Sequence, residues 1–102
     1  MNKKFLNTCF FLGLTLIFLP LTAHSADQRP TVLANTCAGC HGTDGKSVGA
    51  IPPLHGMKAD YFTDTMKAFR SDKREGTVMN RIAKGFTDEE IGSMATFFSE
   101  LK

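Results

Sequence analysis

"NTCAGCHGTDG", residues 35–45, is the stretch that decides how this chain of 102 residues folds. Cys37 and Cys40 are the only cysteines after Cys9, and His41 follows the second of them directly. Two thiols and an imidazole at this spacing are typical of a disulfide, of half a zinc site, or of a covalently attached haem. The rest of the sequence has to discriminate between these three arrangements.

The N-terminal segment indicates the compartment in which the cysteines function. Two lysines precede residues 5–21, an apolar run without charge, and small residues follow it. This order is typical of a secretory signal peptide, and we predict that residues 1–25 are cleaved. A retained membrane anchor is the alternative, but the run is close to the lower length limit for spanning a bilayer. We therefore expect residues 26–102 to form a single periplasmic domain without stable membrane insertion.

Length and charge restrict what this domain can be. A domain of this size buries only a thin core and usually needs a disulfide, a metal or a cofactor for stability. Without the two lysines of the predicted signal peptide, ten Lys and Arg balance ten Asp and Glu. A domain with no net charge is not expected to bind nucleic acid or an anionic membrane surface.

Helical periodicity recurs along the domain, and strand signals are almost absent. The expected helical segments are residues 29–40, 57–70, 76–85 and 87–101. Residues 41–56 contain four glycines and two prolines and are predicted to be a loop. The last helix begins with a capping-box sequence, in which Thr87 is the N-cap and Glu90 follows three residues later. The pattern predicts an all-α domain of three to four short helices.

These features allow the three arrangements to be compared. A redox disulfide of the thioredoxin kind needs a preceding strand, and a structural disulfide across so short a loop restrains little of the unfolded chain. A structural zinc site needs four ligands, but His55 is the only other histidine in residues 26–102. The sequence Cys-x-x-Cys-His is the attachment site of c-type haem. In that arrangement Cys37 and Cys40 bond to one haem edge, and His41 reaches the iron.

A histidine-bound haem iron raises the question of its sixth ligand. The candidates in residues 26–102 are Met57, Met66, Met79, Met94 and His55. Met66 and Met94 lie on the apolar faces of predicted helices, where methionine usually fills the core. Met57 and His55 lie in or beside the predicted loop and stay open as ligands. The pattern favours Met79, which precedes the last helix.

Several segments together resemble a known family. They are "CAGCHGTDG" (37–45), "PPLHGMKADYF" (52–62), "MNRIAKGFTDEEI" (79–91) and "MATFF" (94–98). These segments resemble, in the same order, the small class I cytochromes c of the c4 and c553 kind. The resemblance implies a class I cytochrome c fold, in which three to four short helices wrap around one covalently bound haem c.

The resemblance also implies roles for individual residues. Cys37 and Cys40 would attach the haem, and His41 and Met79 would be the axial ligands of the iron. A proline carbonyl in the segment at residues 52–56 would accept a hydrogen bond from the second nitrogen of His41. The doubled proline leaves open whether Pro52 or Pro53 provides that carbonyl.

A second resemblance concerns the partner. Residues 71–98 are similar to the haem subunits of the flavocytochrome c sulfide dehydrogenases. This implies a periplasmic carrier of single electrons, not an enzyme by itself, that accepts electrons from a sulfide-oxidising flavoprotein. The alternative is a free electron shuttle between respiratory complexes. Tyr61, Arg70 and Arg74 are candidates for contacts with the haem propionates, or else ordinary surface side chains.

Overall fold

The computed structural model describes residues 29–102, which form helices and loops without a β-strand. The helices are α1 Arg29–Asn35, α2 Ala38–His41, α3 Ala59–Arg70, α4 Met79–Ala83 and α5 Asp88–Glu100, with a 3-10 turn, η1, at Thr43–Gly45. The predicted signal peptide, residues 1–25, lies outside the described residues. None of the helices in the described part of the chain has the length and apolar character that a membrane span requires.

The helix predicted over residues 29–40 is interrupted, which corrects the expectation from periodicity. α1 ends at Asn35, and α2 starts at Ala38. The interruption follows from Thr36, whose hydroxyl and amide both donate to the Leu33 carbonyl, at 2.6 and 3.1 Å. A threonine hydroxyl that bonds a nearby carbonyl competes with the regular helical ladder. Cys40 therefore lies in its own short helix, with Cys37 as the N-cap of that helix, and not at the end of a long one.

The other predicted helices are present with shifted ends. α3 starts at Ala59, two residues later than predicted, and α4 is shorter than the predicted segment 76–85. The capping box of α5 is confirmed. Thr87 Oγ1 accepts a hydrogen bond from the Glu90 amide at 3.2 Å, and the Thr87 amide donates to Glu90 Oε2 at 2.9 Å. These two bonds satisfy amides that the first turn of a helix leaves unpaired.

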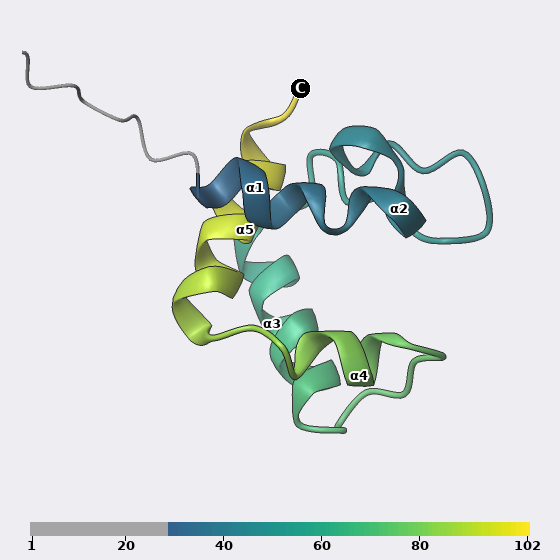
Figure 1. Cartoon of the computed structure of the whole chain (residues 1–102), viewed down its shortest axis with the longest axis vertical. Coiled ribbons are helices and arrows are strands. Elements are labelled where there is room, and N and C mark those ends of the chain that lie inside the picture. Colours follow the sequence, from purple (N-terminus) through teal and green to yellow (C-terminus); the bar gives the residue numbers. More distant parts are fainter. Residues whose placement is uncertain (1–28) are drawn as a thin grey trace, which may run out of the picture.

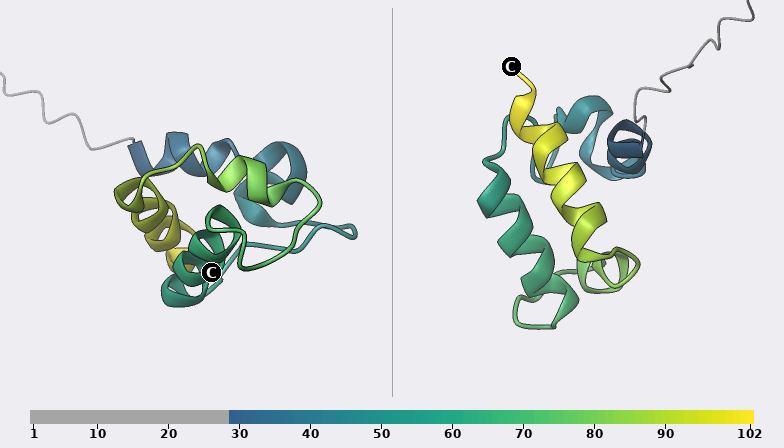
Figure 2. Two further views of the ribbon diagram at one scale, coloured as in Figure 1. Left: turned by 90° about the horizontal axis from the view of Figure 1, so that it is seen from below. Right: turned by 90° about the vertical axis from the view of Figure 1, so that its left-hand side faces the viewer.

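The core lies where α1 and α3 both pack against α5. Figure 2 shows α3 and α5 side by side, and Figure 1 shows α1 crossing α5 near its C-terminal end. Aromatic rings fill the centre: the Phe98 ring lies 5.5 Å from that of Phe62 and 5.3 Å from that of Phe97. The buried residues are Ala34, Leu54, Phe62, Met66, Ala83, Ile91, Met94, Ala95 and Phe98. This is a small core, as the length of the chain predicts.

The arrangement of the helices determines where the candidate ligands lie. α2 with the loop that follows it, and α4 with the loop that precedes it, extend to the same side of the α3–α5 pair (Figure 1). The segment with α2 lies at one end of that pair, and the segment with α4 lies at the other end. The segment with the cysteines and the segment with Met79 are thus on one side of the molecule.

Candidate functional site

One turn of helix presents the thiols and the imidazole together. Cys37 is at the N-cap position of α2, and His41 is its last residue. The Cys37 carbonyl accepts hydrogen bonds from the amides of Cys40, at 3.2 Å, and of His41, at 2.9 Å. Residues three and four positions apart lie on the same face of a helix. Cys40 and His41 therefore each lie within one turn of Cys37, on neighbouring parts of the helix surface.

The described residues give no support to a disulfide or to zinc. Cys37 and Cys40 are not bonded to each other. Burial raises the pKa of the Cys37 thiol, and a weaker hydrogen bond from Thr36 acts in the opposite direction. A raised thiol pKa is the reverse of the activated thiolate in redox motifs. Among residues 29–102 no group of three or more His, Cys, Asp and Glu side chains is placed to bind one metal ion.

The imidazole of His41 has a fixed orientation. Its Nδ1 lies 2.6 Å from the Pro52 carbonyl oxygen. Because a carbonyl only accepts hydrogen bonds, Nδ1 carries the proton and donates it. The neutral ring then has its lone pair on Nε2, the atom that a metal would bind. The structure also answers a question left open by the sequence, since the carbonyl belongs to Pro52 and not to Pro53.

Gly45 places the Pro52 carbonyl beside His41. Its own carbonyl accepts hydrogen bonds from the amides of Leu54, at 2.9 Å, and of His55, at 3.3 Å. Gly45 has a φ of +69°, and a Cβ there would lie 2.7 Å from the Leu54 Cβ. Only glycine allows the returning loop to approach this closely. Leu54 is buried in the core and anchors the returning loop two residues after Pro52.

The methionines fall into two groups. Met66 and Met94 are 4% and 0% exposed and belong to the core, as their helical positions predict. Met57 and Met79 are half-buried and pack against the core from outside it. Met79 is the first residue of α4, on the same side of the α3–α5 pair as α2 (Figure 1). Its assignment as an iron ligand stays a prediction.

The residues considered for propionate contacts have protein partners. Arg70 donates to the Phe86 carbonyl at 3.0 Å and forms an ion pair with Asp88. The hydrogen bond from Arg70 is the main reason why the pKa of Asp88 is lowered. Arg74 lies over the Phe69 ring, 5.1 Å from its centroid, and its hydrogen bond lowers the pKa of Tyr61.

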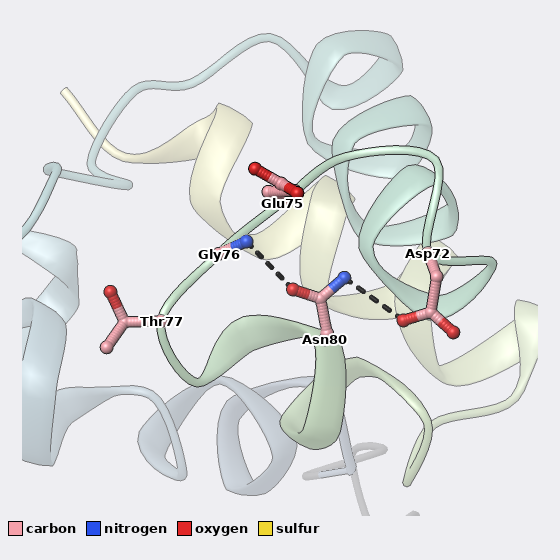
Figure 3. A pocket seen from close by; sticks show the side chains of 5 residues that line it. All are labelled: Asp72, Glu75, Gly76, Thr77 and Asn80. Atoms are coloured by element: carbon pink, nitrogen blue, oxygen red, sulfur yellow. Dashed lines mark hydrogen bonds between the residues drawn. The ribbon is translucent and has the colours of Figure 1, made fainter.

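One residue beside Met79 was not singled out from the sequence. The Asn80 side chain accepts a hydrogen bond from the Gly76 amide at 2.8 Å. Its amide group lies within hydrogen-bond distance of the Phe69 carbonyl at 3.0 Å, the Arg74 carbonyl at 2.8 Å and Asp72 Oδ1 at 3.2 Å. Figure 3 shows Asn80 pointing into the pocket beneath the loop, toward Gly76 and Asp72. The only sequence signal was an asparagine directly after the methionine.

The residues present fit a haem. Their donor set is two free thiols, an imidazole with Nε2 available and a half-buried thioether. The segments that carry these donors also expose large apolar side chains: Val48 and Ile51 after α2, and Val78 and Ile82 at α4. Exposed apolar side chains that gather beside polar donors are typical of a cofactor site.

Comparison with known proteins identifies the family. The cytochrome c family matches residues 30–102, almost all of the described chain. The chain belongs to the cytochrome c family. This confirms the predicted class I cytochrome c domain with one covalently bound haem c and a function in electron transfer with partner proteins. Members of this family are electron carriers.

Three similar proteins illustrate the range of these relatives. The cytochrome subunit of sulfide dehydrogenase from Chlorobaculum tepidum is 40% identical over 82 residues, which cover 80% of this chain and 74% of the relative. Cytochrome c-554(548) from Halomonas halodenitrificans is 40% identical over 68 residues, 63% of this chain and 82% of the relative. The thiosulfate dehydrogenase electron acceptor of Stutzerimonas stutzeri is 35% identical over 69 residues, 64% of this chain and 32% of the relative.

Proposed function

We propose that Cys37 and Cys40 attach the haem of this cytochrome, and that His41 and Met79 are its axial ligands. The observation that carries the proposal is the hydrogen bond between His41 Nδ1 and the Pro52 carbonyl at 2.6 Å. This bond directs Nε2 outward as a ligand atom and makes the imidazole a stronger electron donor. The adjacent thiols on the same face of α2 are suited to covalent attachment.

The proposed ligands determine which chemistry is available. When bound, haem iron supplies a centre that accepts and donates one electron at a time. The imidazole and thioether side chains would occupy both axial positions and leave none for a substrate. The soft thioether of Met79 would favour the reduced iron and raise the reduction potential relative to two histidines. The chain's own contribution is to fix these ligands so that little moves when the charge changes.

The donor of the electrons is proposed to be a sulfide-oxidising flavoprotein. Oxidation of sulfide to the zero-valent level releases two electrons, but one haem takes only one. Within residues 29–102 both cysteines are assigned to haem attachment, so no thiol is left for sulfur chemistry. Sulfide oxidation then belongs to a partner with a two-electron group such as flavin. The resemblance of residues 71–98 and the similarity to the cytochrome subunit of sulfide dehydrogenase support this choice.

The compartment follows from the same proposal. We place the chain in the periplasm after cleavage of residues 1–25, as the N-terminal pattern predicts. A free electron shuttle between respiratory complexes is the second candidate. It is favoured by the equal identity, 40%, to cytochrome c-554(548), whose name does not include an enzyme.

Co-purification from periplasm distinguishes the two candidates. The tagged cytochrome is isolated under mild conditions, and the visible spectrum of the eluate is examined for flavin. We expect a flavoprotein to co-purify, and sulfide to reduce the haem rapidly only when that flavoprotein is present. The cytochrome alone should not oxidise sulfide catalytically. If no flavoprotein binds and the cytochrome exchanges electrons at similar rates with unrelated respiratory proteins, the free shuttle is the correct function.

A further inference from the structure

The side chain of Asn80 joins the segment that carries Met79 to the end of α3. We propose that Asn80 is a positioning residue that holds Met79 in place and so limits how readily its thioether leaves the haem iron. The inference rests on the proposed ligation by Met79. The proposed role belongs to Asn80, the residue after the ligand, and Asn80 is not expected to contact the haem itself.

The loop between α3 and α4 depends on this side chain. Residues 71–78 are all exposed, so burial contributes little to their order. Backbone bonds from the amides of Lys73 and Arg74 to the Ala68 carbonyl close the start of the loop. The Asn80 side chain connects the rest, because its partners are Phe69 at the end of α3 and Arg74 and Gly76 within the loop. One amide thus joins three points of the chain to the first turn of α4.

The contacts of Gly76 link this network to Met79. A Cβ on Gly76 would lie 2.8 Å from Cε1 of the Phe69 ring and 3.3 Å from the Met79 Cβ. The backbone at Gly76 therefore fits closely against both side chains. Since the Gly76 amide donates to Asn80 Oδ1 at 2.8 Å, the hydrogen bond keeps this backbone against Phe69. The backbone of Gly76 thus lies between Phe69, at the end of α3, and the Met79 side chain.

An asparagine is the side chain that this network needs. Its oxygen accepts from Gly76, while its NH₂ group donates to backbone carbonyls. Asn80→Asp would keep the acceptor and lose both donors, which leaves the Phe69 and Arg74 carbonyls without this partner. It would also place a second carboxylate within reach of Asp72.

The nearby ion pair is expected to matter less. Lys84 Nζ lies 2.8 Å from Asp72 Oδ2, but both side chains are more than half exposed. Exposed ion pairs contribute little because water and salt screen them. Lys84→Ala is therefore the matched control for a change in the same loop. Thr87→Ala, which removes the cap of α5, is the control for a general loss of stability.

The test measures how easily an added ligand replaces the thioether in the ferric holo-protein. Imidazole is titrated against the unaltered protein and against the Asn80→Asp, Asn80→Ala, Lys84→Ala and Thr87→Ala variants. Both Asn80 variants should bind imidazole more tightly and faster, on the order of tenfold, because two or more hydrogen bonds are lost. The two controls should bind it like the unaltered protein, even where Thr87→Ala lowers the melting temperature.

Two results would overturn parts of this account separately. If the Asn80 variants bind imidazole no better than the controls, the positioning role is wrong. If Met79→Ala retains the weak long-wavelength absorption of sulfur-bound ferric haem, the ligand assignment itself is wrong. If the Asn80 variants behave like the controls but Met79→Ala does lose this absorption, only the positioning role is wrong and the proposed function stands.

Discussion

Replacement of Gly45 by alanine should disturb the histidine side of the haem site from a position that touches no haem ligand. The glycine has a φ of +69°, which costs an alanine about 1–2 kcal/mol. The new Cβ would lie 2.7 Å from the Leu54 Cβ and 2.8 Å from the His55 amide nitrogen. Neither atom is at the end of a flexible side chain, and such overpacking typically costs about 1–3 kcal/mol.

Together these costs predict that Gly45→Ala loses about 2–5 kcal/mol of folding free energy. For a domain of this size the melting temperature should fall by roughly 8–40 °C. Thermal unfolding of the ferric holo-protein, followed by circular dichroism, measures the change. Gly49→Ala is the matched control, because this glycine is in the same loop and a Cβ there meets nothing within 4 Å. If Gly45→Ala and Gly49→Ala have the same melting temperature, the close approach of the loop does not position Pro52, and the reasoning is refuted.

Two further predictions concern the whole domain. Cys37→Ala combined with Cys40→Ala should leave residual helix without a cooperative melt, because the small core lacks the apolar haem; a sharp thermal transition would show that the polypeptide core suffices. The ion pair with Arg70 lowers the pKa of Asp88 in the folded state, so its contribution is complete at neutral pH and is lost as the pH falls below about 4. Melting temperatures of the unaltered protein and of Asp88→Asn should therefore converge on acidification, and a gap that widens would contradict this.

The features that local sequence chemistry determines were predictable. The Cys-x-x-Cys-His unit predicts its cofactor because covalent attachment fixes the spacing of the three side chains. The start of α5 was predicted because Thr87 and Glu90 cap it within one turn. Met66 and Met94 were assigned to the core because helical periodicity alone determines which face they occupy.

The features that depend on contacts across the chain were not predictable. Periodicity does not report the hydrogen bonds of Thr36 that end α1, so residues 29–40 were predicted as one helix. The choice of Pro52 over Pro53 depends on where Gly45 brings the loop back. Asn80 was missed because its partners are spread over residues 69–76 and meet only after α4 packs on α3.

The most direct test of the central claim is the absorption spectrum of the ferric holo-protein with single methionines replaced. Met79→Ala should abolish the weak long-wavelength band of sulfur-bound haem and allow cyanide to bind. Met57→Ala, a change in the other half-buried methionine, should leave the band intact. Loss of the band in Met57→Ala and its persistence in Met79→Ala would contradict the proposed His41 and Met79 ligation.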